Sequence, residues 1–109
     1  NDNSYYYQWA GNGPKGYDCS GFTKYLYSTY LGINDFPRNS GEQANYMSAY
    51  RIPVSDAQPG DLLWKKNHVG IYYGNGQSVE AMGANWGICF GKASRFTYAY
   101  SLSRYFANK

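Results

Sequence analysis

The chain has 109 residues, which is enough for one domain with a modest hydrophobic core. Its formal net charge of +3 is mild, and no lysine- or arginine-rich run indicates a nucleic-acid-binding surface. No apolar segment approaches the roughly 20 residues that a transmembrane segment requires. With 14 tyrosines, 3 tryptophans and 5 phenylalanines, the core must be partly aromatic, and surplus tyrosines are candidates to line a groove for sugar or peptide.

The first sixteen residues form an aromatic segment that contains Tyr7 and Trp9, followed by a glycine-rich loop over residues 11–16. The sequence begins with neither an initiator methionine nor a signal peptide. We therefore expect residues 1–109 to be a single domain excised from a longer protein.

A helix is predicted to begin within residues 17–22, which read YDCSGF. Asp18 is a good N-cap, because its carboxylate can accept hydrogen bonds from the unpaired N–H groups of the first turn. Apolar residues recur with helical spacing as far as Tyr30, and Gly32 is placed to end the helix. Cys19 then lies at the positive end of the helix dipole, which favours the thiolate, but for the helix alone an inert buried thiol is the default interpretation.

The second half of the chain predicts an antiparallel sheet. A turn around Pro37 and a short helix from Ser40 to Met47 come first, and residues 51–59 are irregular. Strands are then predicted over four segments: 62–65, 68–73, 77–82 and 96–102. Helices followed by an antiparallel sheet define an α+β fold.

The loop over residues 74–76 determines which side chains share a face of the sheet. If it is a three-residue hairpin loop, Tyr73 faces Gln77, and Glu80 lies opposite Gly70 and diagonal to His68. The diagonal spacing is short enough for a glutamate and an imidazole to form a hydrogen bond. A two-residue turn would instead place Glu80 on the other face.

His68 is the only histidine of the chain, so no other residue can supply an imidazole. If the helix that carries Cys19 packs against the His68–Glu80 face, a nucleophile, a base and an orienting carboxylate come together. One histidine and one available cysteine are too few for a zinc site, so no metal is expected. Cys89 lies in an apolar strand-like run and is predicted to be an inert core residue that forms no disulfide with Cys19.

This pattern resembles the NlpC-type family of papain-like cysteine peptidases, which cut bacterial cell-wall peptides. The resemblance rests on four segments in the family's order: YDCSGF at 17–22, FPRNS at 36–40, PGDLL at 59–63, and residues 68–81. It implies a papain-like α+β fold, in which N-terminal helices, with the catalytic cysteine at a helix N-terminus, pack on a C-terminal antiparallel sheet. Residues 1–109 would then be one catalytic domain.

By this resemblance Cys19 is the nucleophile, His68 is the base and Glu80 occupies the third position of the triad. That position is commonly histidine in the family, and a carboxylate should hold the imidazolium more strongly. Tyr7 matches the family's tyrosine before the nucleophile, whose hydroxyl is expected to help hold the oxyanion beside the Cys19 N–H.

Several residues are candidates for substrate binding. Asp18 and Ser20 flank the nucleophile and are placed to contact a stem-peptide amine, although N-capping also explains Asp18. Arg38 is a candidate partner for a substrate carboxylate, with a structural ion pair or a solvated turn as the alternatives. Trp9, Trp64 and Trp86 are candidates for the rim of the cleft. For Trp64, core packing is favoured.

The implied reaction is hydrolysis of a peptidoglycan stem peptide at the bond between γ-D-glutamyl and the diamino acid, without metal or cofactor. It would take place outside the cell or in the cell wall, or the domain would belong to a lysin of a phage or mobile element. Additional wall-binding or catalytic domains are expected in the full-length protein. The alternatives are an N-acetylmuramoyl-L-alanine amidase or cross-bridge endopeptidase, or a non-catalytic wall-binding module, against which the presence of Cys19 and His68 argues.

Overall fold

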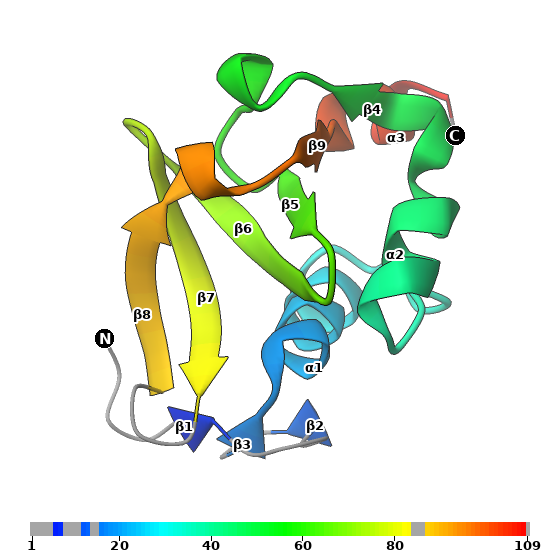
Figure 1. Cartoon of the computed structure of the whole chain (residues 1–109). Coiled ribbons are helices and arrows are strands. Elements are labelled where there is room, and N and C mark those ends of the chain that lie inside the picture. The colour runs from blue at the N-terminus through cyan, green and yellow to red at the C-terminus, as the bar shows by residue number, and fades with distance from the viewer. Residues whose placement is uncertain (1–5, 8–11, 14–15, 84–86, 109) are drawn as a thin grey trace.

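The computed structural model describes the backbone of residues 6–7, 12–13, 16–83 and 87–108, and the side chains of residues 18–81 and 87–108. These residues form two sheets (Figure 1). A small sheet has the order β1-β3-β2, and its strands are β1 (Tyr6–Tyr7), β2 (Asn12–Gly13) and β3 (Gly16–Tyr17). It leads directly into helix α1 (Cys19–Tyr25), beside which it lies in Figure 1.

The helices precede most of the larger sheet, as predicted. Helix α1 continues as a π-helical turn, η1 (Leu26–Tyr30), and the chain leaves it through Gly32, whose φ of 74° is the expected left-handed conformation. After the turn around Pro37 comes α2 (Ser40–Tyr46), followed by a 3₁₀ turn, η2 (Ser48–Tyr50). The region predicted to be irregular contains β4 (Arg51–Ile52) and the 3₁₀ turn η3 (Val54–Asp56).

The larger sheet has six antiparallel strands in the order β4-β9-β5-β6-β7-β8. Its remaining strands are β5 (Leu62–Lys65), β6 (His68–Gly74), β7 (Gln77–Gly83), β8 (Gly87–Lys92) and β9 (Tyr98–Tyr100). This arrangement confirms the predicted α+β fold. The 3₁₀ turn η4 (Ala93–Arg95) connects β8 to β9.

The predicted terminal strand is wrong at both of its ends. Only β9 is a strand, and α3 (Leu102–Ala107) begins directly after Ser101. The Ser101 hydroxyl accepts a hydrogen bond from the backbone N–H of Arg104, so this serine is an N-cap. An alternation of apolar and polar residues suggested a longer strand, but the capping serine ends it.

The β6–β7 hairpin keeps the predicted register by a different route. Asn75 and Gly76 both have positive φ, 55° and 77°, as in a two-residue turn with left-handed backbone. A bulge places Gly74 opposite Gln77, so the prediction that Tyr73 faces Gln77 is wrong. The bulge compensates for the shorter turn, and the next two pairs are as predicted: Tyr72–Ser78 and Ile71–Val79.

Two hydrophobic clusters cover opposite faces of the larger sheet, because consecutive strand residues such as Leu62 and Leu63 point to opposite sides. The larger cluster joins the helices to the sheet and is partly aromatic, with Tyr27 and Phe36 fully buried. The smaller one contains Ile52, Ala57, Leu63, Ala93, Phe96 and Ala99.

Cys19 packs against the larger cluster, which includes Val69 and Ala81. The body of α1 therefore packs on the apolar face and not on the His68–Glu80 face, so that prediction is wrong for the helix as a whole; only Cys19, its first residue, acts on His68, the first residue of β6. The His68–Glu80 face is covered instead by the η3 and η4 regions and by Phe96.

Candidate active site

Cys19 is the first residue of α1, and its local position follows from the preceding aspartate. The Asp18 carboxylate accepts a hydrogen bond from the backbone N–H of Gly21 at 2.7 Å, which confirms the predicted N-cap. Cys19 is half-buried and its thiol is free. The N-cap therefore fixes the start of the helix, and it leaves a partly accessible thiol there.

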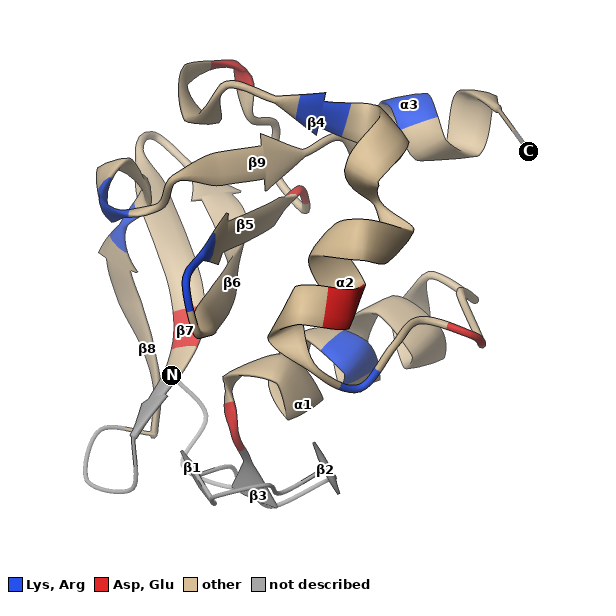
Figure 2. Cartoon of the chain, turned by 45° about the vertical axis from the view of Figure 1, so that its right-hand side comes forward, with Lys and Arg blue, Asp and Glu red and all other residues tan. Residues whose placement is uncertain are grey.

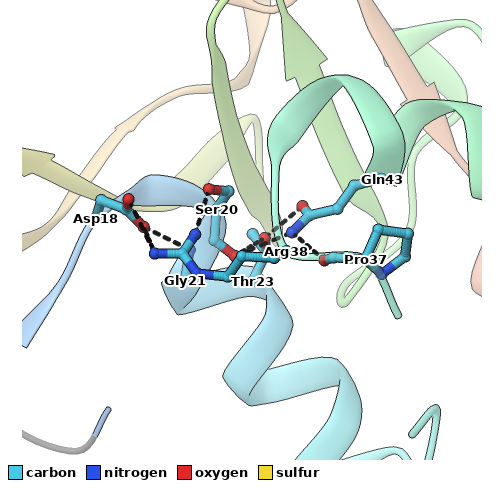
Figure 3. A network of polar contacts seen from close by, with 7 residues as sticks. All are labelled: Asp18, Ser20, Gly21, Thr23, Pro37, Arg38 and Gln43. Atoms are coloured by element: carbon cyan, nitrogen blue, oxygen red, sulfur yellow. Dashed lines mark hydrogen bonds and ion pairs between the residues drawn. The ribbon is translucent and has the colours of Figure 1, made fainter. Parts of the chain in front are cut away.

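Arg38 connects the two residues that flank Cys19 (Figure 3). Its Nη2 lies 3.0 Å from Oδ1 of Asp18, and its Nη1 donates to the Ser20 hydroxyl at 2.8 Å. Three of the four predicted substrate-binding residues are thus brought together at the start of α1, where each contacts another. The fourth, Trp9, lies outside the described residues.

A buried glutamine holds the same region to α2 (Figure 3). Gln43 Nε2 donates to the carbonyl oxygens of Ser20 and Pro37, each at 2.9 Å, and its Oε1 accepts from Thr23 at 2.6 Å. Gln43 and Thr23 are fully buried. These bonds fix the turn that carries Arg38 against the helix that carries Cys19.

His68 and Glu80 form the contact that the hairpin register predicts. His68 Nε2 lies 2.7 Å from Oε1 of Glu80, whose side chain is 0% exposed. Gly70 leaves the room for this contact, because a Cβ there would lie 2.9 Å from Glu80 Cγ. The imidazole also stacks on Phe96, with ring centroids 5.7 Å apart and an interplanar angle of 17°.

The electrostatics of the site favour charged forms of both partners. Burial lowers the pKa of His68, but hydrogen bonds with Cys19 and Glu80 outweigh it and raise this pKa to about 9. Burial likewise raises the pKa of Glu80, but hydrogen bonds from His68 and Ser78 and the charge of Arg95 bring it below its usual value. An imidazolium next to an ionised glutamate is therefore favoured at neutral pH.

Cys19 acts on His68, as Glu80 does, since hydrogen bonding with the thiol and the charge of the thiolate both raise the pKa of the imidazole. Because Nε2 is engaged by the carboxylate, Nδ1 is the ring nitrogen left for the thiol. The imidazole thus connects the helix start to the sheet. Chemically, this arrangement can form a thiolate–imidazolium pair with a carboxylate behind it.

Sequence reasoning missed the second charged partner of Glu80. Arg95 Nη2 donates to Oε2 of Glu80 at 2.7 Å, and the Ser78 hydroxyl donates to the same oxygen. Ser78 shares a strand face with Glu80, and that period-2 spacing was a usable signal. Arg95 follows in a 3₁₀ turn after the next strand, and no local pattern relates it to Glu80.

Four further predicted residues have different outcomes. The backbone of Tyr7 pairs with Tyr17 in the small sheet, next to the start of α1, but its side chain lies outside the described residues. Cys89 is half-buried rather than a core residue, because β8 is the edge strand of the larger sheet, and burial raises the pKa of its free thiol. Trp64 packs partly buried against the core and stacks on Tyr98, whereas Trp86 lies outside the described residues.

A separate cavity of about 850 Å³ lies around the tip of the β6–β7 hairpin and η4. Its lining contains none of Cys19, His68 and Glu80, so it is not the candidate active site. Among the side chains that the structure describes, no three of the His, Cys, Asp and Glu type converge as metal ligands would. None of the described helices has the length and apolar character needed to cross a membrane.

The fold and the site define a papain-like domain of the cysteine-peptidase type, with the cysteine on a helix and the histidine on a sheet. The chain belongs to the NlpC/P60 family, whose model matches residues 4–106. The crystal structure of the NlpC/p60 domain of the peptidoglycan hydrolase SagA superposes with a TM-score of 0.79, at 33% identity over 91% of this chain and 88% of that one.

Two curated relatives bear names that state an activity. The protein named "Probable endopeptidase p60" of Listeria innocua is 47% identical over 74% of this chain and 20% of its own length. "Murein DD-endopeptidase MepH" of Escherichia coli is 34% identical over 69% of this chain and 30% of its own length. The chain thus spans only 20% and 30% of the length of these two relatives.

Proposed function

We propose that this domain hydrolyses amide bonds in the stem peptides of peptidoglycan, with Cys19, His68 and Glu80 as its catalytic triad. The observation that carries the proposal is the His68 imidazole, which lies 2.7 Å from Glu80 and whose pKa is raised by both Cys19 and Glu80. The substrate class is supported by SagA, a peptidoglycan hydrolase, and by MepH, a murein endopeptidase.

The first half of the reaction forms a thioester. The Cys19 thiolate attacks the scissile carbonyl carbon, so that a C–S bond forms and the carbonyl oxygen becomes an oxyanion. The backbone N–H of Cys19 and the hydroxyl of Tyr7 are the proposed donors to that oxyanion; the loss of one such donor costs about 3–4 kcal/mol of transition-state stabilisation. The C–N bond then breaks as the His68 imidazolium gives its proton to the leaving amine.

The second half releases the acyl group. Neutral His68 removes a proton from water, and the oxygen attacks the thioester carbonyl. The C–S bond breaks, which returns Cys19 as the thiolate and His68 as the imidazolium. Throughout both halves Glu80 keeps its charge and orients the ring, and no metal or cofactor takes part.

The proposed scissile bond joins γ-D-glutamyl to the diamino acid. Asp18 and Ser20 lie on either side of the nucleophile, where a substrate amine would meet the Asp18 carboxylate, which keeps 15% of its side chain exposed. Arg38 keeps 34% of its side chain exposed and is the proposed partner of a substrate carboxylate. Trp9 is the proposed aromatic rim of the same cleft.

A second candidate is cleavage of the cross-bridge between two stem peptides. The name of MepH, a DD-endopeptidase with 34% identity to this chain, favours it over an amidase. In either case the domain would act in the cell wall, outside the cytoplasm. Because its relatives are several times longer, we propose that the complete protein carries further domains.

Digestion of defined muropeptides, followed by mass spectrometry of the products, tests the proposal. We expect two fragments separated at the γ-D-glutamyl–diamino acid bond, whose summed mass exceeds that of the substrate by one water. Cys19→Ala should leave the muropeptides intact. Cleavage only of cross-linked dimers would support the second candidate, and release of the intact stem peptide from the sugar would support the amidase.

A further inference from the structure

The buried Glu80 carboxylate has a charged partner on the side away from His68. Arg95, the last residue of η4, donates from Nη2 to Oε2 of Glu80 at 2.7 Å. The other oxygen, Oε1, is 2.7 Å from His68 Nε2. Ser78 also donates to Oε2, so each oxygen of the carboxylate has its own partners. The reaction described above makes no use of Arg95.

Two glycines provide the space for this arrangement. A Cβ at Gly91 would lie 2.5 Å from both Arg95 Nη2 and Glu80 Oε2, so any larger residue would separate the pair. On the opposite side, a Cβ at Gly70 would lie 2.9 Å from Glu80 Cγ. The two strands that flank β7, β6 and β8, thus each have a glycine where Glu80 contacts a cationic partner. This spacing makes the Arg95–Glu80 contact a built feature of the site.

The charged groups alternate along one line of contacts. Glu80 is faced by His68 from β6, by Arg95 from η4 and by Cys89 from β8, and Cys19 of α1 helps to raise the pKa of His68. Burial raises the pKa of the Cys89 thiol, which therefore stays neutral near pH 7. In the ion-pair form, thiolate, imidazolium, carboxylate and guanidinium have a net charge of zero.

Without Arg95, one imidazolium would have to neutralise two anions. The fully buried Glu80 carboxylate would then compete with the Cys19 thiolate for the charge of His68, and the thiolate would be disfavoured. With Arg95 present, the carboxylate is neutralised from its other oxygen. The imidazolium is then available to the sulfur.

We propose that Arg95 is a positioning residue, which neutralises Glu80 and fixes its orientation so that the His68 imidazolium stabilises the Cys19 thiolate. The inference rests on the proposed function, because it assigns Arg95 to the same triad. Arg95 acts through Glu80 and does not touch the substrate.

The test compares Arg95→Met and Arg95→Lys with the wild type. The matched control is Arg104→Met, which replaces an exposed arginine of α3 and changes the net charge by the same amount as Arg95→Met. The first measurement is the rate at which iodoacetamide alkylates Cys19 at pH 6, followed by mass spectrometry. We expect Arg95→Met to slow this rate about tenfold and Arg95→Lys to recover most of it. The control should alkylate like the wild type.

Two further measurements separate positioning from a structural role. The acidic limb of the kcat/KM profile should move to higher pH in Arg95→Met. An NMR titration of His68, the only histidine, should show no fall in its pKa in Arg95→Met, because the carboxylate remains and a nearby cation is lost. In Glu80→Gln the same pKa should fall.

The inference is overturned if Arg95→Met alkylates at the wild-type rate and keeps the wild-type pH profile, since Arg95 then only braces the β8–β9 connection. If Arg95→Met does not fold, Gly91→Ala replaces it, because this variant keeps both charges and drives them apart; an unchanged alkylation rate there has the same meaning. Alkylation and NMR need no turnover. Wall hydrolysis retained by Cys19→Ala would therefore refute the proposed function separately.

Discussion

The Nε2 atom of His68 lies 2.7 Å from Oε1 of Glu80, a contact between two neighbouring strands of one sheet. Its geometry depends on Gly70, which lacks the side chain that would displace Glu80. The contact also assigns a different partner to each ring nitrogen of His68: Nε2 bonds to Glu80, and only Nδ1 remains for Cys19. Orientation of the imidazole is therefore set by the sheet, and the helix brings the thiol to it.

Replacement of Glu80 separates its charge from its orienting effect. Glu80→Gln keeps an oxygen acceptor for His68 but removes the charge, so we expect about tenfold lower kcat/KM and acidic and basic limbs of the pH profile that lie closer together. Glu80→Ala also releases the ring and should lower kcat/KM about a hundredfold. Full activity of Glu80→Ala would leave a Cys19–His68 dyad without a third member.

The raised pKa of His68 predicts a specific pH dependence of stability. Its folded-state pKa of about 9 exceeds the ordinary value of 6.5, so its contacts add stability that is fully present below pH 6.5 and is lost as the pH rises through 9. The difference corresponds to about 3 kcal/mol of unfolding free energy. Urea unfolding at pH 6.5 and 9.5 should show this loss, and a smaller loss in Glu80→Gln. Parallel curves for the two proteins would contradict it.

The two cysteines should differ in reactivity. Cys19 is paired with an imidazole whose pKa it helps to raise, whereas burial raises the pKa of the Cys89 thiol, so iodoacetamide at pH 6 should label Cys19 and spare Cys89. Cys19→Ala should abolish hydrolysis and change the melting temperature little. Because Cys89 is only half-buried, Cys89→Ser should lower the unfolding free energy by about 1 kcal/mol or less and keep the activity. Equal labelling of both thiols would refute the assignment.

The fold could be predicted largely because local signals agree with it. The N-cap at Asp18, the left-handed Gly32 and the period-2 strands all describe interactions within a few residues. The His68–Glu80 contact could be predicted for the same reason, since a hairpin relates two residues that are twelve apart. The bulge was not predicted, but it preserved the register beyond the turn.

What could not be predicted involves contacts between segments without a local pattern. Arg95 reaches Glu80 from a 3₁₀ turn two elements further along the chain, and its partner choice depends on the space left by Gly91. Hydrophobic clusters lie on both faces of the larger sheet, and α1 packs against one of them. The alternation of residues along the strands does not show which face that is. Charges give no further guide, because Lys and Arg residues are spread over several of the described elements (Figure 2).

Tyr7 tests the proposed oxyanion site. The backbone of Tyr7 pairs with that of Tyr17, and Tyr17 lies two residues before Cys19. Tyr7 and Cys19 therefore belong to one local structure. If its hydroxyl donates to the oxyanion, Tyr7→Phe should lower kcat by about a hundredfold or more and leave KM and the melting temperature unchanged. Tyr6→Phe is the neighbouring control, with wild-type kcat expected. A raised KM with unchanged kcat in Tyr7→Phe would indicate that the ring only packs.

Asp18 poses the question of whether the residues around Cys19 bind substrate or only hold the helix. Asp18→Asn keeps an oxygen acceptor for the Gly21 N–H but removes the negative charge that pairs with Arg38. Because this ion pair is partly exposed, it contributes less than about 1 kcal/mol to stability. Asp18→Ala also removes the cap and should lower the unfolding free energy by about 1 kcal/mol more. Stability therefore separates the cap from the charge.

Measurements of kcat and KM then show whether the Asp18 charge binds substrate. If the Asp18 carboxylate receives a substrate amine, Asp18→Asn should raise KM several-fold for a stem peptide with a free amine and leave kcat nearly unchanged. The same variant should show the wild-type KM on a peptide whose amine is acetylated, because that substrate offers no positive charge. An equal change on both substrates would mean that Asp18 acts through Arg38 and the start of α1, and that the amine is bound elsewhere.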